Sequence, residues 1–291
     1  MITQNLPHYQ LLDSGLGRKL ETISGLKVTR PSPQAIWKPL LKDSDWSSAP
    51  SNCLRTKDGG GKWEHNNGPP PQMALPFEID GKKLHFKLKF TSFGHCGVFF
   101  EQVPVWEWLY REVKALKEKL GRAPKVLNLF GYTGCASLVM ASAGAEVFHV
   151  DSAKGVLDWG KESLALSSLD PKSVRWVQED ALEFLRHSFK KSFTYDGVLA
   201  DPPSWGHGVK KEVWDFEKQI SLLTELILNV VSKDQSFFFL TSHTHGVQTE
   251  ALRNIICDKR WKSMETGELG VRHANDARVL PAGIFVNARS Y

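Results

Sequence analysis

The sequence lacks long apolar runs. No segment approaches the ~20 consecutive apolar residues of a membrane-spanning helix, because the most apolar runs are only Leu226 to Val231 and Phe237 to Leu240. The first residues also lack a basic segment followed by an apolar block, which is the pattern of a secretory or transit signal. We therefore expect a cytoplasmic protein with no membrane partner.

Cysteine is also scarce. The four cysteines, Cys53, Cys96, Cys135 and Cys257, are scattered over 291 residues, and none forms a pair at metal-ligand spacing. We therefore expect neither a disulfide framework nor a metal site. The net charge of +5 is mildly basic, which permits an anionic partner without requiring one.

From Lys125 onward, short apolar runs alternate with longer amphipathic stretches. Strands are predicted to begin near Val126, Glu146, Val174, Tyr195 and Ser236, with helices at 135–143, 153–169, 180–190, 213–231 and 247–258. Two further strands, at 263–271 and 283–288, are joined by a polar loop and Pro281. This order predicts an α/β fold for 99–291: a Rossmann-like, seven-stranded, mostly parallel sheet with helices on both faces and a terminal β-hairpin.

The first hundred residues are rich in turn-forming clusters, at 58–61, at 66–71 and at Asp80-Gly81, and predict a smaller β-rich N-terminal domain over 1–98. In Lys83 to Phe90, apolar residues alternate with Lys83, His85, Lys87 and Lys89, so one strand face is basic. This face, together with Lys210 and Lys211 in a later loop, can contact phosphates of a nucleic acid. The alternative is an ordinary solvated face.

A glycine-containing turn, Asn128-Leu-Phe-Gly-Tyr-Thr-Gly134, follows the first predicted strand of the α/β domain. Ligands bind at such strand ends in open α/β sheets. Twenty residues after Gly131 the next strand ends at Asp151, whose carboxylate can accept hydrogen bonds from ribose hydroxyls. Dinucleotide-binding folds share both features, and a turn that only reverses the chain is a further alternative.

The middle of the turn favours a different cofactor. A dinucleotide site needs glycine there, whereas this chain has Tyr132 and Thr133. S-adenosylmethionine has no phosphate, and its zwitterionic tail tolerates a less closely packed turn. Asp180, at the end of the third strand, can accept a hydrogen bond from the adenine amine or cap a helix. The candidate cofactor residues are Asn128, Phe130, Gly131, Tyr132, Thr133, Gly134, Asp151, Ser152, Asp180 and Ala181.

The fourth predicted strand ends in Asp201-Pro-Pro-Ser-Trp205. Two prolines cannot continue a sheet ladder, so they stiffen the backbone just past the strand. The candidate catalytic residues are Asp201, Pro202, Pro203 and Trp205: a carboxylate and carbonyls orient an acceptor nitrogen, and the indole stacks on a nucleobase. The alternative is a strand ended by proline with a tryptophan in the core. We interpret His207, His243 and His245 as ordinary loop or strand-end residues.

These segments together resemble class I methyltransferases, and more closely the bacterial large-subunit rRNA methyltransferases that act on cytosine C5 or guanine N7. The similarity covers roughly 93–291 and includes the turn 128–134, the signature 201–205 and Gly97-Val-Phe-Phe-Glu-Gln102. The resemblance implies S-adenosylmethionine as cofactor and RNA, most naturally rRNA, as substrate. It also implies that the element at 97–102 covers the cofactor, which adds Phe99, Phe100 and Glu101 to the candidate cofactor residues.

The sequence departs from the family at three places. Cytosine-modifying members have a cysteine after the fifth strand, where this chain has Thr241-Ser242-His243. Because carbon methylation of a pyrimidine needs a thiolate nucleophile, we expect methylation of a base nitrogen. Val103 stands where the family has arginine, and no N-terminal RNA-binding module is recognisable in 1–35.

Three other functions remain open at this point. The same site can methylate a protein amide or a small amine. A non-catalytic RNA-binding protein can retain the fold, and a nicotinamide-dependent oxidoreductase shares the glycine turn and the distant acid. The sequence does not indicate an oligomeric state.

Overall fold

The computed structural model describes the chain apart from residues 56–60, 67, 69, 71, 92–93 and 210–211. The chain forms two compact units: unit 1 comprises Met1–Pro104 and Leu269–Ala282, and unit 2 comprises Val105–Glu268 and Gly283–Tyr291. The expected boundary after residue 98 falls inside unit 1. The sequence also gave no sign that a late segment returns to the N-terminal unit.

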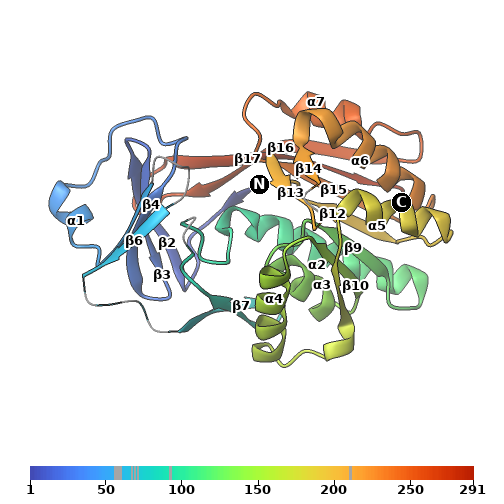
Figure 1. The fold of residues 1–291 in the computed structure, drawn as a ribbon, viewed down its shortest axis with the longest axis horizontal. Coiled ribbons are helices and arrows are strands. Elements are labelled where there is room, and N and C mark those ends of the chain that lie inside the picture. Colours follow the sequence, from blue (N-terminus) through green and yellow to red (C-terminus); the bar gives the residue numbers. More distant parts are fainter. Residues whose placement is uncertain (56–60, 67, 69, 71, 92–93, 210–211) are drawn as a thin grey trace. The chain divides into compact units, whose positions relative to one another are not determined.

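Unit 2 is an α/β domain built on a mostly parallel sheet (Figure 1). Its strands are ordered β16-β17-β15-β12-β9-β10-β11. The parallel members are β9 (Lys125–Leu129), β10 (Glu146–Asp151), β11 (Val174–Gln178), β12 (Gly197–Ala200) and β15 (Phe237–Ser242), and β17 (Val279–Arg289) runs antiparallel to β15. The seven expected strands are therefore confirmed, with β16 spanning Ser263–Arg272, but the sheet has eight strands because β1 (Ile2–Thr3) pairs with β16 at its edge. Pro281 lies within β17 and not in the connection before it.

Helices cover both faces of this sheet (Figure 1). The alternating side chains of one face pack with α5 (Ala181–Lys190), α6 (Phe216–Val230) and α7 (Thr249–Ile255) into one apolar cluster. The opposite face packs against α2 (Val103–Leu120), α3 (Cys135–Ser142) and α4 (Lys154–Leu166). Since parallel strands are buried on both faces, they read as continuous apolar runs, and such runs made β9, β12 and β15 predictable.

Two elements of unit 2 were missed from the sequence. Helix α2 buries Val105, Leu109, Val113 and Leu116, which recur at helical spacing, so the signal was present. The stretch expected to start a helix at residue 213 instead forms β14 (Val213–Asp215), paired with β13 (Trp205–His207). Among the described residues, no helix is long and apolar enough to cross a membrane.

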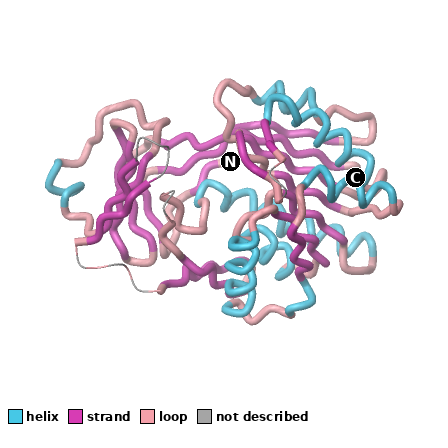
Figure 2. Tube along the Cα trace, viewed as in Figure 1, coloured by secondary structure: helices cyan, strands magenta, loops and turns pink. Residues whose placement is uncertain are grey.

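Unit 1 is built mainly from strands (Figure 2), as expected for a β-rich domain. Its main sheet has the order β2-β3-β4-β5-β6, formed by Tyr9–Gly15, Arg18–Ile23, Leu26–Pro31, Ser51–Arg55 and Gly61–His65. A separate hairpin joins β7 (Met73–Ile79) to β8 (Lys82–Leu88), and β1 (Ile2–Thr3) pairs with Gly270 and Val271 of β16. A short helix, α1, spans Asp43–Ser47.

Two-residue turns set the register of three hairpins in unit 1. Both central residues have positive φ in Leu16-Gly17, Ser24-Gly25 and Asp80-Gly81, and such turns match the twist of paired strands. The turn expected at Asp80-Gly81 is therefore confirmed. The clusters at 58–61 and 66–71 fall partly outside the described residues.

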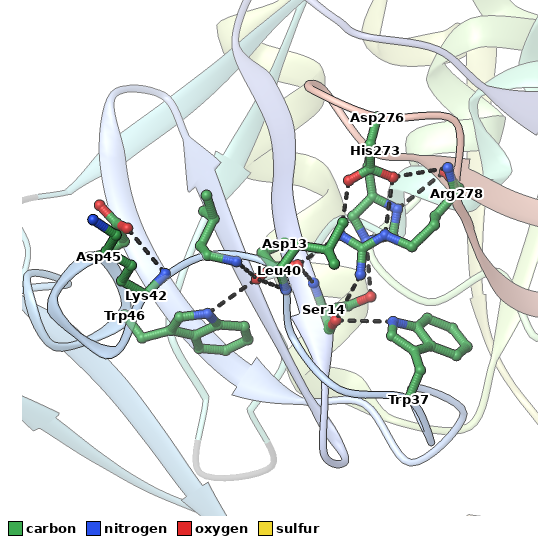
Figure 3. A network of polar contacts seen from close by, with 11 residues as sticks. Asp13, Ser14, Trp37, Leu40, Lys42, Asp45, Trp46, His273, Asp276 and Arg278 are labelled. Carbon is green, nitrogen blue, oxygen red and sulfur yellow. Dashed lines mark hydrogen bonds and ion pairs between the residues drawn. The ribbon is translucent and has the colours of Figure 1, made fainter.

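The returning segment of unit 1 is fastened by a polar network around Asp13 (Figure 3). Arg278 donates to Oδ1 of Asp13 at 2.7 Å, while the backbone N–H groups of Leu40 and Leu41 donate to Oδ2 at 3.0 and 2.8 Å. Burial raises the pKa of Asp13, but the hydrogen bond from Arg278 and those from backbone N–H groups lower it below its usual value. A single buried carboxylate thus joins β2, the loop before α1 and the loop between β16 and β17.

We expect Asp13→Ala to lower the free energy of unfolding by about 3 kcal/mol, because it leaves Arg278 and several N–H donors without their buried acceptor. Asp45→Ala is the matched control. Asp45 only accepts one exposed hydrogen bond, from Lys42 N at 3.2 Å, so its loss should cost at most about 1 kcal/mol. Urea denaturation followed by tryptophan fluorescence measures both, and equal losses would contradict the role given to Asp13.

Candidate functional site

The strand order of unit 2 locates a ligand site. From β9 the chain moves outward to β10 and β11 on one side and then to β12 and β15 on the other. The order therefore reverses between β9 and β12, and open α/β sheets bind ligands at the carboxyl ends of the strands beside such a switch point. The turn after β9 and the Asp201 segment after β12 both lie at this edge, because Leu129 and Ala200 are paired in register.

The turn after β9 has an unusual backbone. Phe130, Tyr132 and Gly134 have φ values of 56°, 52° and 82°, so two residues other than glycine occupy the left-handed region of backbone conformation. Each such residue costs about 1 to 3 kcal/mol, and these residues cluster at functional sites. A Cβ at Gly131 would lie 2.4 Å from the His149 ring. The glycine is thus required by close packing of the turn on β10, and not by contact with a phosphate.

A buried polar layer supports the turn from below. Asn128 donates to Ser137 Oγ at 2.8 Å, and Ser137 Oγ lies 2.9 Å from Nδ1 of His149. His149 is fully buried, and burial lowers its pKa to about 3, so its ring is neutral at physiological pH. The expected cofactor residue Asn128 is therefore part of the support beneath the turn.

Asp151 joins the turn to the start of α4. Its Oδ2 accepts from Tyr132 N and its Oδ1 from Ala153 N, both at 2.9 Å. Burial raises the pKa of Asp151, while the N–H groups of Ala153 and Tyr132 lower it in part, and the net pKa lies above the usual value. Each carboxylate oxygen has a second lone pair, so the geometry is compatible with two ribose hydroxyl donors.

Asp180 caps α5, which was one of its two expected roles, the other being a hydrogen bond from the adenine amine. Its Oδ1 accepts from the backbone N–H groups of Leu182 and Glu183 at 2.9 and 3.1 Å. Both cap bonds use Oδ1 and neither uses Oδ2, so capping and binding of an adenine amine are compatible. Ala181 is buried in the first turn of α5, and the Ser152 hydroxyl donates to the His207 carbonyl at 3.2 Å.

The structure brings Asp201 together with two residues that sequence reasoning did not select. Thr241 Oγ1 donates to Oδ1 of Asp201, and Nε2 of His243 lies 3.2 Å from the same oxygen. Burial raises the pKa of Asp201, but His243 and the hydrogen bonds from His243 and Thr241 lower it more, so the net pKa lies below its usual value. His243, interpreted from the sequence as an ordinary strand-end residue, directly follows β15 and also contacts Asp201.

Trp205 lies on the surface of unit 2, so the alternative of a core tryptophan is wrong. Trp205 is 59% exposed and is the first residue of the β13–β14 hairpin. Its ring packs edge-on against the His207 ring, with 4.4 Å between the ring centroids. The core position is taken by Trp214, whose Nε1 donates to the Pro203 carbonyl at 2.6 Å. Pro202 is buried and Pro203 is exposed.

The remaining candidates lie in unit 1. Phe100 is buried and stacks on Tyr9 with ring centroids 3.5 Å apart, so its side chain belongs to the core of that unit, while Phe99 and Glu101 are half-buried. Strand β8 has the expected alternation: Leu84, Phe86 and Leu88 are buried, and the basic residues are exposed or half-buried. Lys210 and Lys211 lie outside the described residues.

Two glycines of α4 provide a matched test of the packing beneath the turn. A Cβ at Gly160 would lie 2.5 Å from the Trp176 ring and 3.0 Å from the Thr133 carbonyl oxygen, whereas a Cβ at Gly155 meets nothing within 4 Å. We expect Gly160→Ala to lower the free energy of unfolding by about 1 to 3 kcal/mol and to weaken S-adenosylmethionine binding. Gly155→Ala should be neutral or stabilise by up to about 1 kcal/mol.

Calorimetric titration and thermal unfolding of the two variants measure these effects. Unchanged cofactor affinity in Gly160→Ala would show that the turn does not depend on this packing. A comparable loss in Gly155→Ala would also contradict the account.

Metal ligands do not gather in the part of the chain that the structure describes: it holds no group of three or more His, Cys, Asp or Glu residues placed to bind an ion. The polar groups at the carboxyl edge of the sheet are instead carboxylates, which accept hydrogen bonds, and backbone groups. This set fits the ribose, adenine and amino-acid parts of S-adenosylmethionine.

Comparison with known proteins supports this interpretation. A family model for S-adenosylmethionine-dependent methyltransferases matches residues 71–233, more than half of the chain. A solved S-adenosylmethionine-dependent methyltransferase from Agrobacterium tumefaciens is similar over 100% of this chain and 94% of its own, with 33% identity and a TM-score of 0.91. A Streptococcus mutans methyltransferase structure has the same fold at 16% identity, with a TM-score of 0.71 over 97% of this chain and 75% of its own.

Curated relatives are similar over a shorter region. The ribosomal RNA large subunit methyltransferases K/L of Shewanella sp. MR-4 and Shewanella oneidensis are 32% and 30% identical over 53% of this chain. The chain spans about a fifth of their length, since the match covers 21% and 20% of these proteins. On the match of the family model and the Agrobacterium structure, the chain belongs to the S-adenosylmethionine-dependent methyltransferase family.

Proposed function

We propose that this protein transfers the methyl group of S-adenosylmethionine to a base nitrogen of RNA, with rRNA as the substrate. The observation that carries the proposal is the exposed Trp205, four residues after an Asp201 carboxylate that Thr241 and His243 hold at the carboxyl edge of the sheet. An exposed indole beside a fixed acceptor suits a planar, unstacked base.

The residues of the chain have separable parts in this reaction. The bound cofactor supplies an activated sulfonium methyl group. Asp201 and the Pro202 carbonyl accept hydrogen bonds from the acceptor base and orient its nitrogen. Thr241 and His243 position the carboxylate, and Trp205 stacks on the base. Catalysis then depends on proximity and orientation, which can supply a large part of the rate enhancement.

The choice of a base nitrogen as acceptor rests on the residues beside Asp201. Thr241 and Ser242 end β15, His243 follows them, and none of the three has a thiol. Methylation of a pyrimidine carbon, in contrast, requires a covalent nucleophile. Cys135, the nearest cysteine in sequence to the candidate cofactor residues, is buried in α3. A base nitrogen has its own lone pair and needs only orientation and, for an exocyclic amine, removal of a proton.

The substrate class rests on the relatives and on the surface of the chain. The Shewanella relatives modify ribosomal RNA, as their names state. Lys83 is exposed on β8 and Lys87 and Lys89 are half-buried beside it, and we propose that this face contacts RNA phosphates. An rRNA substrate would place the reaction in the cytoplasm.

Variants of the two central residues test the proposal. We expect Asp201→Ala to lower kcat for RNA methylation at least about 100-fold, while the Kd for S-adenosylmethionine stays close to that of the parent protein. Trp205→Ala should raise KM for RNA about ten-fold through lost stacking, and Trp205→Phe should restore most of it. Val213→Ala, on the same hairpin and 53% exposed, is the matched control.

Transfer of tritiated methyl groups to total RNA, measured at varied RNA and cofactor concentrations, separates kcat from KM. Full turnover by Asp201→Ala would remove the carboxylate from the mechanism. Label that resists ribonuclease but is lost to protease would support methylation of a protein side chain instead.

A further inference from the structure

Unit 1 contains a cavity of about 410 Å³, within the range of about 300 to 1,000 Å³ typical of ligand pockets. Its walls come from β3, β4, β5, β6, the segment before α2 and the returning segment at the end of the chain. All lining residues belong to unit 1, and they include neither the turn after β9 nor any of the three strand-end carboxylates. Strands β3, β4, β5 and β6, the segment before α2 and the returning segment therefore build a second concave site.

Buried charges hold one wall of this cavity in place. Glu21 is fully buried and binds Arg30 at 2.7 Å and Lys19 at 3.0 Å, and the Tyr9 hydroxyl donates to it at 2.8 Å. Burial raises the pKa of Glu21, but Arg30 and Lys19 lower it to about 2, so it stays ionised. Buried ion pairs contribute little net stability. The pairs with Glu21 instead hold the charged groups of Lys19 and Arg30 in place at the cavity wall.

Cationic side chains outnumber carboxylates around the cavity. Lys19, Arg30 and Arg55 line it together with Glu101, and the buried Glu21 pairs with Lys19 and Arg30. His95 also lines it, and burial, with the charges of Arg30 and Lys19, lowers the pKa of its ring to about 4. Its imidazole is therefore neutral at physiological pH and presents one hydrogen-bond donor and one acceptor.

The cavity also has an apolar and rigid side. The Phe99 ring packs edge-on against His95 with centroids 5.2 Å apart, and both residues line the cavity with three prolines, Pro31, Pro33 and Pro281. Gly94 has a φ of 78°, and a Cβ there would lie 2.9 Å from Cys53 Sγ. A preformed site with an aromatic ring, a neutral imidazole and cations at its walls combines the groups that recognise a base with those that recognise a phosphate.

We propose that this cavity binds one phosphorylated nucleotide, with Lys19 and Arg55 on the phosphate and His95, Phe99 and Glu101 on the base. The proposal rests on the RNA substrate proposed above. It names a second contact for the RNA strand, away from the methylated base. It gives Phe99 and Glu101 a part in substrate recognition, in place of the cofactor contact that family resemblance implied.

Three variants and one control test this site. Lys19→Gln and Arg55→Gln each remove one cation, and Ala282→Trp fills the cavity from β17. Lys27→Gln makes the same charge change on β4, where Lys27 contacts Ser48 at 3.0 Å outside the cavity. Binding of a 5′-fluorescein-labelled single-stranded RNA is followed by anisotropy at several salt concentrations, with S-adenosylhomocysteine at saturation so that the cofactor site is filled.

We expect each cavity variant to raise the Kd for RNA about ten-fold, as for the loss of a charged hydrogen bond, and Lys27→Gln to leave it unchanged. The two charge variants should also reduce the slope of log Kd against log salt by about 1. Uridine 5′-monophosphate should compete with the RNA, because the proposed site holds a single nucleotide. Failure of uridine 5′-monophosphate to compete would contradict the proposal.

RNA affinity that is unchanged in all three cavity variants would overturn the proposal, even if the protein methylates RNA. The converse pattern, with RNA affinity lost in these variants but no methyl transfer to RNA, would support the cavity and contradict the proposed function. Displacement of the labelled RNA by an acidic peptide, but not by uridine 5′-monophosphate, would assign the cavity to a protein partner and overturn the proposal.

Discussion

The turn after β9 lies directly on the buried His149 ring, and the candidate cofactor site depends on this contact. A side chain at Gly131 has no room there, so the backbone itself forms the floor of the site. Phe130 and Tyr132 adopt left-handed conformations around that glycine, and the N–H of Tyr132 is thereby directed at the Asp151 carboxylate at 2.9 Å. The strain of the turn is offset by packing on β10 and by this hydrogen bond.

Three carboxylates at the same edge of the sheet are held in three different ways. Asp151 is bound by backbone N–H groups on both oxygens, Asp180 is bound by two N–H groups on one oxygen, and Asp201 is bound by side chains of the neighbouring strand. Burial raises the pKa of Asp151, while His243 and Thr241 keep the pKa of Asp201 low. Asp151 and Asp201 thus have different electrostatic environments at one edge of the sheet.

Local patterns in the sequence predicted much of this architecture. Buried parallel strands are continuous apolar runs, and Asp180 precedes a helix as a capping residue does, so the five parallel strands β9, β10, β11, β12 and β15 and the cap of α5 were accessible. The pairing of Thr241 and His243 with Asp201 was not, because it depends on the register between β12 and β15. The exposure of Trp205 likewise depends on a short hairpin, and the local pattern assigned its second strand, β14, to a helix. Helix α2 was overlooked although its apolar residues recur at helical spacing.

Unit 1 shows the same limit at a larger scale. Its β-rich character follows from turn residues such as Asp80-Gly81, but residues 269–282 are separated from it by the whole of the α/β sheet in sequence. Only the structure shows that Arg278 completes the bonds of Asp13, and that Leu280, Pro281 and Ala282 close the wall of the cavity. Contacts between distant segments carry no periodic signal, so the cavity had no counterpart in the sequence.

The central claim is methylation of a base nitrogen in RNA. Nucleoside mass spectrometry of rRNA from cells with and without the gene tests it most directly. The account predicts that one nitrogen-methylated nucleoside disappears from the rRNA when the gene is removed and returns with the intact gene, but not with its Asp201→Ala variant. Loss of 5-methylcytidine, or rRNA with an unchanged set of methylated nucleosides, would contradict it.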